Sequence, residues 1–128
     1  MTIDDYIKNG CTVENALITG TDISIDDYPI VSISLRLSSG FSVVFGGVMF
    51  GRMRDDEIIG WDKGITAIFR ILQLADVSHW DELAGRPLRA ILRNNSIVAI
   101  AHFLDADKVL DYAELAKVCP CENVNIQD

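Results

Sequence analysis

The sequence predicts a single α+β domain built on one antiparallel β-sheet, and three observations lead to this prediction. Its 128 residues are the usual length of one domain. Residues 30–37 alternate strictly between apolar and polar side chains, which is the period of a half-buried antiparallel strand. Residues 61–75 change to helical spacing, and residues 87–103 contain two further strand-like segments. We therefore expect three strands, a central helix, two strands and a C-terminal helix, in that order.

The first half of the chain is expected to form the first three strands. Residues 1–11 are a polar lead-in, and residues 12–19 are predicted to form the first strand. Residues 21–29 contain turn-forming residues and a proline, so they are expected to connect two strands. After the strand at residues 30–37, a Ser-Ser-Gly turn leads into a third strand at residues 41–50. Two consecutive glycines in this third strand indicate a bulge or the close approach of another backbone or a ligand.

The central helix is predicted over residues 61–75, after a charged loop at residues 52–57. Its large apolar side chains recur at positions i, i+3, i+4 and i+7, and this stripe is expected to dock on the sheet. The stripe consists of Ile65, Ile68, Phe69 and Leu72. A short helical turn follows, and its Trp80 and Leu83 are expected to lie in the core. Trp61, at the start of the long helix, fits either the core or an interface.

Residues 87–93 and 96–103 are predicted to form a hairpin, because the two asparagines between them tolerate the left-handed backbone of a tight turn. A two-residue loop pairs position 93 with 96, 91 with 98 and 89 with 100. Five side chains share one face in this register: Arg89, Ile91, Arg93, Ile100 and His102. A last helix is expected from about residue 105 to residue 117, followed by a poorly ordered tail at residues 118–128.

The charge of the chain narrows the classes of partner. There are 19 acidic and 11 basic residues, which gives a formal net charge of −8. Such a charge repels polyphosphate, so long DNA or RNA is not expected as a partner. A small anion held by a few local arginines remains compatible with it. The N-terminus lacks the basic start and apolar run of a signal peptide, and no stretch approaches the ~18 apolar residues of a membrane span. We therefore expect a cytoplasmic protein without a membrane partner.

The cysteines and histidines do not predict a metal site. Cys11 stands alone, and the Cys-Pro-Cys formed by Cys119 and Cys121 is too short for a zinc knuckle. His79 and His102 are isolated in the sequence. We expect ordinary thiols in a reducing compartment and no bound metal.

No local motif predicts catalysis. The chain contains no nucleophile motif, no dinucleotide fingerprint and no phosphate-binding loop, because no Gly-Lys-Ser/Thr follows the Phe45-Gly46-Gly47 sequence. Paired carboxylates occur at residues 26–27 and 55–57, where such runs are typical of solvated loops. The sequence therefore favours a protein that is not an enzyme.

Arginine usage is more informative. Seven of the eleven basic residues are arginine, and Arg86, Arg89 and Arg93 cluster around one strand. Arginine suits phosphate because its planar fork donates two parallel hydrogen bonds. Arg93 lies beside the turn and is expected to be exposed, whereas the hairpin register places Arg89 beside His102 and an aliphatic wall. His102 on its own is more typical of a structural histidine.

Phe45 and the two glycines after it have two interpretations. One is core packing beside a bulge, and the other is an aromatic platform next to bare backbone, suited to stacking a purine. The spacing of these residues does not separate the two.

Several motifs follow one another in a fixed order between about residues 13 and 112. The most specific is Trp-x-x-Leu-x-Gly-x-x-x-Arg, from Trp80 to Arg89, followed by Ala-Ile-x-His ending at His102. The full set is Ile25-Asp26-Asp27-Tyr28-Pro29-Ile30, Phe45-Gly46-Gly47, Gly64-Ile65, Ile71-Leu72, residues 80–89 and residues 97–104. This ordered set resembles a family of small phage and prophage proteins whose best-described members are the first-described type of Thoeris anti-defence sponge.

The resemblance implies a small α+β protein that binds a ligand and catalyses no reaction. Such sponges sequester cyclic ADP-ribose isomers made by an immune TIR-domain enzyme, and some members also bind cyclic oligonucleotides at separate sites. They form dimers that assemble further into hexamers, with ligand held at subunit boundaries. For this chain, the resemblance implies a cyclic nucleotide signal as partner, a homodimer or hexamer, no cofactor, and the cytoplasm of a bacterial host.

Together, the residues and the resemblance predict a ligand-binding set. Arg89 is the expected phosphate ligand, Phe45 the pocket-lining aromatic residue, and Gly46-Gly47 the backbone of close approach. Arg86, Arg36 and His102 are further candidates. The alternative hypothesis is a phage or prophage protein-interaction module whose acidic surface faces a host protein, and a nucleotide hydrolase is a third.

Overall fold

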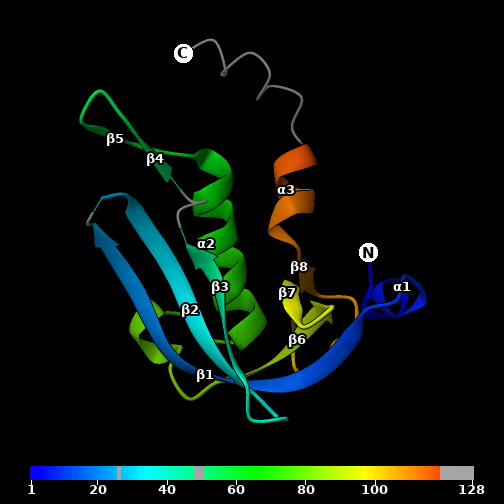
Figure 1. Cartoon of the computed structure of the whole chain (residues 1–128). Coiled ribbons are helices and arrows are strands. Elements are labelled where there is room, and N and C mark those ends of the chain that lie inside the picture. Colours follow the sequence, from blue (N-terminus) through cyan, green and yellow to red (C-terminus); the bar gives the residue numbers. More distant parts are fainter. Residues whose placement is uncertain (26, 48–50, 119–128) are drawn as a thin grey trace.

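The computed structural model describes residues 1–25, 27–47 and 51–118, and it shows a six-stranded antiparallel sheet that curls around a long helix (Figure 1). The strand order is β3-β2-β1-β6-β7-β8, and β4 and β5 form a separate hairpin. The predicted α+β class is therefore confirmed. The helices are α1 (Ile3–Lys8), α2 (Asp62–Ala75) and α3 (Tyr112–Val118), with a 3₁₀ turn η2 (Trp80–Glu82). The strands are β1 (Thr12–Ile25), β2 (Pro29–Leu37), β3 (Ser42–Gly47), β4 (Gly51–Arg54), β5 (Glu57–Gly60), β6 (Pro87–Arg93), β7 (Ser96–Ala101) and β8 (Val109–Leu110).

The sheet carries apolar side chains on both faces. The inner face packs under α2 and α3 and forms the larger core, whose fully buried side chains include Ile18, Ile33 and Leu35. The outer face of β6 and β7 forms a smaller core with α1, built around Ile91 and Tyr6. No helix in the described part of the chain is long and apolar enough to cross a membrane.

The first strand is longer than predicted. β1 continues to Ile25 and pairs with β2 down to Ile25 opposite Pro29, so the predicted connector at residues 21–29 shrinks to a short turn that includes Asp26, which lies outside the described residues. An irregularity in register between Ile18 and Gly20 shifts the alternation of side chains. The alternating Thr-Asp-Ile-Ser-Ile sequence at residues 21–25 is itself a strand pattern, and it overrides the turn-forming composition.

The charged loop predicted at residues 52–57 is a hairpin. Asp55 and Asp56 adopt φ values of 50° and 66°, and these left-handed residues close the turn between β4 and β5. The predicted third strand at residues 41–50 ends at Gly47, and its last three positions lie outside the described residues.

Helix α2 has nearly the predicted bounds but buries a different face. Its residues toward the sheet are small or aliphatic, namely Gly64, Ala67, Ile71, Leu74 and Ala75. Ile65 and Phe69, which were expected to dock on the sheet, are 55% and 60% exposed. The physical reason is that glycine and alanine allow a helix to approach a curled sheet more closely than the bulkier stripe would.

The register of the β6–β7 hairpin also differs from the prediction. Arg93 pairs with Ser96 as expected, but one extra residue on β7 shifts the partners of Ile91 and Arg89 to Ala99 and Ala101. Arg89 therefore does not share a face with Ile100 or His102, which was the basis for placing it in a site with them. Ile100 belongs to the inner core, whereas Ala99 and Ala101 belong to the outer one.

The two ends of the chain contain elements that the sequence patterns did not predict. The lead-in forms α1, which Thr2 and Asp5 open as a capping box. In place of a helix from residue 105, the chain forms the short strand β8 before α3 begins at Tyr112. The predicted tail lies outside the described residues from position 119, as do Cys119 and Cys121.

Candidate functional site

Phe45 lies in the core and offers no platform to a ligand. Its side chain is 5% exposed and packs with the inner core under α2. The interpretation of Phe45 as a pocket-lining aromatic residue is therefore wrong, and the core-packing interpretation is confirmed. The following Gly46 and Gly47 have φ values of 107° and 116°, which only glycine adopts readily. An added Cβ at Gly47 would meet nothing within 4 Å, so the backbone conformation accounts for that glycine.

The predicted arginines occupy different parts of the molecule. Arg86 donates from Nε to the carbonyl oxygen of Ala75 over 3.0 Å, which caps the C-terminus of α2 with a positive charge. Arg36 lies opposite Leu17 on the outer face of the sheet and is exposed. Trp61, for which two roles were open, is half-buried, with its ring edge-on to Tyr112 at 5.9 Å.

Arg89 and His102 are neighbours through the backbone and not through a shared site. Arg89 Nε donates to the carbonyl oxygen of His102 over 2.9 Å and so holds the end of β7. Its Nη2 atom is buried without a hydrogen-bond partner among the described residues. The predicted ligand-binding set is thus spread over the core, the outer face and the end of α2, and does not converge on one cavity.

His102 joins the sheet to the end of α2. Its Nε2 lies 2.7 Å from a carboxylate oxygen of Asp76, and its Nδ1 accepts hydrogen bonds from the backbone N–H groups of Leu104 and Asp105, each over 3.0 Å. Because Nδ1 accepts, Nε2 carries the proton and donates it to Asp76. Both ring nitrogens are therefore engaged, and His102 shapes the segment that leads to β8.

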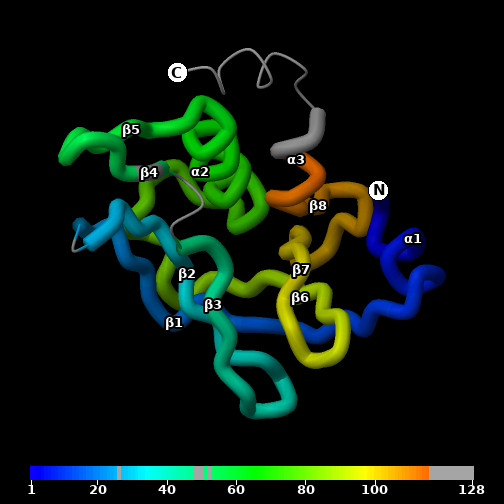
Figure 2. Tube along the Cα trace, turned by 45° about the horizontal axis from the view of Figure 1, so that its top comes forward, coloured from blue at the N-terminus to red at the C-terminus, as the bar shows by residue number. Residues whose placement is uncertain are grey.

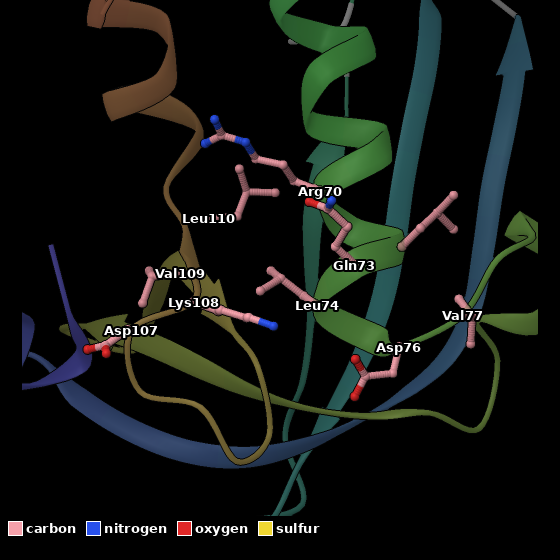
Figure 3. Close-up of a pocket in the computed structure, with 10 residues that line it drawn as sticks. Arg70, Gln73, Leu74, Asp76, Val77, Asp107, Lys108, Val109 and Leu110 are labelled. Atoms are coloured by element: carbon pink, nitrogen blue, oxygen red, sulfur yellow. The ribbon is translucent and has the colours of Figure 1, made fainter.

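A pocket of about 490 Å³ lies between α2 and the segment containing β8. Arg70 extends from α2 toward that segment, and Lys108 extends from it toward α2 (Figure 3). Leu74 and Leu110, which are almost fully buried, form the apolar floor. The remaining lining residues are Leu72, Gln73, Asp76, Val77, Asp107 and Val109.

The charges around this pocket are not fully compensated. Within the described ranges, neither Arg70 nor Lys108 has an ion-pair or hydrogen-bonding partner of its side chain. Asp76, in contrast, is engaged by His102. Two exposed cations with free donors, facing each other across an apolar floor, form a local positive site on an acidic protein.

Sequence reasoning did not find this pair. Arg70 and Gln73 stand three residues apart, a spacing that places them on the same helical flank, and this signal was present in the sequence. Lys108 could not be paired with them, because the sequence predicted a helix where β8 forms.

Comparison with protein-family models, with curated proteins and with solved structures finds no match. Among the described residues there is also no group of three or more histidine, cysteine or acidic side chains placed to hold a metal ion. The geometry of the pocket is therefore the main structural basis for a functional proposal.

Proposed function

We propose that this chain binds a small cyclic nucleotide signal in the pocket between α2 and β8 and sequesters it without converting it. The observation that carries the proposal is the pairing of Arg70 and Lys108 across a single pocket with an apolar floor. The sequence resemblance to anti-defence sponges supports the same ligand class. In that setting, the protein would act in the cytoplasm of a bacterial host and prevent an immune signal from reaching its effector.

The pocket suits the chemistry of such a ligand. A volume of about 490 Å³ falls within the range of roughly 300–1,000 Å³ that holds small molecules. The guanidinium of Arg70 can bind a phosphate with two parallel hydrogen bonds, and Lys108 adds a compact charge from the opposite wall. Gln73 offers a donor and an acceptor for a base edge, and Leu74 and Leu110 offer an apolar surface for the base.

The state of His102 supports binding without turnover. A general base needs a free nitrogen within reach of the substrate, but both nitrogens of His102 are already engaged. Sequestration needs affinity and abundance and requires no acid, base or nucleophile.

Titration calorimetry tests the proposal. Cyclic ADP-ribose isomers and cyclic di- and trinucleotides are titrated into the protein, and at least one is expected to bind with a dissociation constant of about 1 μM or tighter. Arg70→Ala and Lys108→Ala are each expected to weaken that binding by about tenfold or more, since a charge-assisted hydrogen bond is lost. Arg54→Ala, which removes an exposed arginine from the β4–β5 hairpin, is the matched control and should not change it. Absence of binding by every probe would overturn the proposal.

The same titrations separate the pocket from the outer face of the sheet. If Arg36→Ala and Arg89→Ala abolish binding while Arg70→Ala and Lys108→Ala leave it intact, the ligand lies on the outer face and the assignment of the pocket is wrong. Heating the complex and analysing the released ligand tests sequestration. Intact ligand is expected, whereas a converted product would identify an enzyme.

A further inference from the structure

The far part of β1 has one strand edge without a partner. β1 pairs with β6 only over Thr12–Leu17, and Ile18 then exchanges backbone hydrogen bonds with Gly85 and Arg86. Residues 21–25 pair with β2 on one side only, and their other edge has no strand partner in the described part of the chain. All five residues are exposed. We call residues 21–25 the open edge.

The open edge is apolar on the inner face of the sheet. Thr21 lies opposite Ile33, a fully buried core residue, so Thr21 and its alternate neighbours Ile23 and Ile25 face inward. Ile23 is 61% exposed and Ile25 is 55% exposed. Proteins usually protect such edges with lysine, proline or a bulge, whereas residues 21–25 contain no lysine or proline and one charge, that of Asp22.

Helix α2 presents a second exposed apolar surface toward the same region. Arg70 and Gln73 lie on the flank of α2 that faces β8. At 100° per residue, Ile65 and Phe69 lie on the opposite flank, directed away from β8 and toward the β1–β2 side. The tip of β1–β2, the β4–β5 hairpin and the start of α2 occupy one end of the molecule (Figures 1 and 2). We call the exposed large side chains of these elements the apolar end: Ile23, Ile25, Tyr28, Ile58, Ile65 and Phe69.

We propose that the open edge pairs antiparallel with the open edge of a second copy of this chain, about a two-fold axis at Ile23. A two-fold axis brings the same edge of both copies together, so one surface serves as both partners. Ile23 then lies opposite Ile23 of the partner subunit, and Thr21 lies opposite Ile25 of the partner subunit. The backbone groups of both edges gain hydrogen-bonding partners in one step.

The charge pattern fits this register. With Ile23 on the axis, Asp22 lies opposite Ser24 of the partner subunit and not opposite a second aspartate. Within one chain, the Ser24 hydroxyl already donates to the Asp22 carboxylate over 3.0 Å, so a second hydroxyl is a compatible neighbour. Direct opposition of like charges, which destabilises a strand pair, is avoided.

The exposed area fits a second copy. The axis is perpendicular to the sheet and keeps both α2 helices on the inner side, with the flanks of Ile65 and Phe69 beside the joined strands. The apolar end exposes on the order of 600–700 Å² of side-chain surface, near the ~800 Å² per partner of a stable interface and at or above the largest apolar patch of a typical monomer. The pairing does not depend on ligand binding in the α2–β8 pocket.

Sedimentation velocity on the full chain tests the pairing. We expect a species of twice the 14.2 kDa chain mass. Ile23→Asp places two carboxylates on the axis and should yield the monomer. The matched control is Phe41→Asp, which changes a side chain that is 74% exposed in the β2–β3 turn, far from the open edge, and should remain dimeric. A wild-type monomer at about 100 μM, or a dimer that survives Ile23→Asp, would overturn the proposal.

A disulfide test checks the register in a Cys119→Ser/Cys121→Ser background. Opposed residues have Cα atoms about 5 Å apart, which a disulfide spans, so Ile23→Cys should form a cross-linked dimer on mild oxidation. Asp22→Cys should not cross-link with itself, but a mixture of Asp22→Cys and Ser24→Cys chains should. Cross-linking of Asp22→Cys alone, or none by Ile23→Cys, would contradict the pairing about Ile23.

Discussion

At the scale of single residues, the contact between Tyr6 and Asp111 ties the first helix to the start of the last one. The Tyr6 hydroxyl donates to a carboxylate oxygen of Asp111 over 2.8 Å, and the side chain is 5% exposed. Burial, followed by the neighbouring carboxylate of Asp111, raises the pKa of Tyr6 above its ordinary value of 10.0. The folded protein therefore keeps this proton at pH values at which the unfolded chain releases it.

This raised pKa predicts the behaviour of the protein in alkaline solution. The stabilisation is complete below pH 10 and decreases as the pH rises beyond it, because only the unfolded state then ionises. Tyr6→Phe should lower the free energy of unfolding by about 1–2 kcal/mol at neutral pH and reduce its fall above pH 10. Urea unfolding followed by tryptophan fluorescence measures both effects. Tyr28→Phe, at an exposed tyrosine, is the control, and an unchanged alkaline slope in Tyr6→Phe would contradict the assignment.

The candidate site shows what single residues reveal in a sequence. The seven arginines correctly drew attention to local positive charge, but residue type does not tell which arginine is already engaged. Arg86 caps α2 and Arg89 holds the end of β7, whereas Arg70 is free to bind a ligand. The partner of Arg70 across the pocket is Lys108, and their proximity depends on how α2 lies beside β8. That contact is long-range and has no local sequence signal.

At the scale of elements, α2 offers a direct comparison of two identical residues. Ile71 is 1% exposed and faces the sheet, whereas Ile65 is 55% exposed on the flank. Ile71→Ala should lower the free energy of unfolding by about 2–4 kcal/mol, because it removes buried surface and leaves a cavity. Ile65→Ala should lower it by less than about 1 kcal/mol. Chemical denaturation in the Ile23→Asp background keeps self-association out of the comparison, and equal losses would show that the sequence-predicted stripe is buried after all.

The elements that the sequence predicted well are those with a strong local period. The alternation at residues 30–37 predicted β2, and the helical spacing at residues 61–75 predicted α2 to within one residue. The missed elements depend on other contacts. β8 has only two residues and exists because it pairs with β7, and α1 is a six-residue helix that packs against β1 and donates a backbone hydrogen bond to Ala106. The extra residue on β7 shifted the hairpin register without any proline or glycine to mark it.

At the scale of the whole molecule, the net charge of −8 acts on the two proposed associations in opposite directions. Two copies of an acidic chain repel each other, so pairing of the open edges should tighten as salt screens that repulsion between about 10 mM and 150 mM, where the Debye length falls from ~30 Å to ~8 Å.

Binding of a nucleotide by Arg70 and Lys108 relies on attraction, so its affinity should fall over the same salt range. Sedimentation velocity measures the first equilibrium and calorimetry the second, in identical buffers, so that each serves as the control for the other. A nucleotide affinity that rises with salt would contradict the cationic pocket and leave the dimer untouched. A dimer that weakens with salt would show that ionic contacts hold the subunits together, in place of the apolar strand edge. The opposite signs distinguish a local positive site on an acidic protein from a general response to ionic strength.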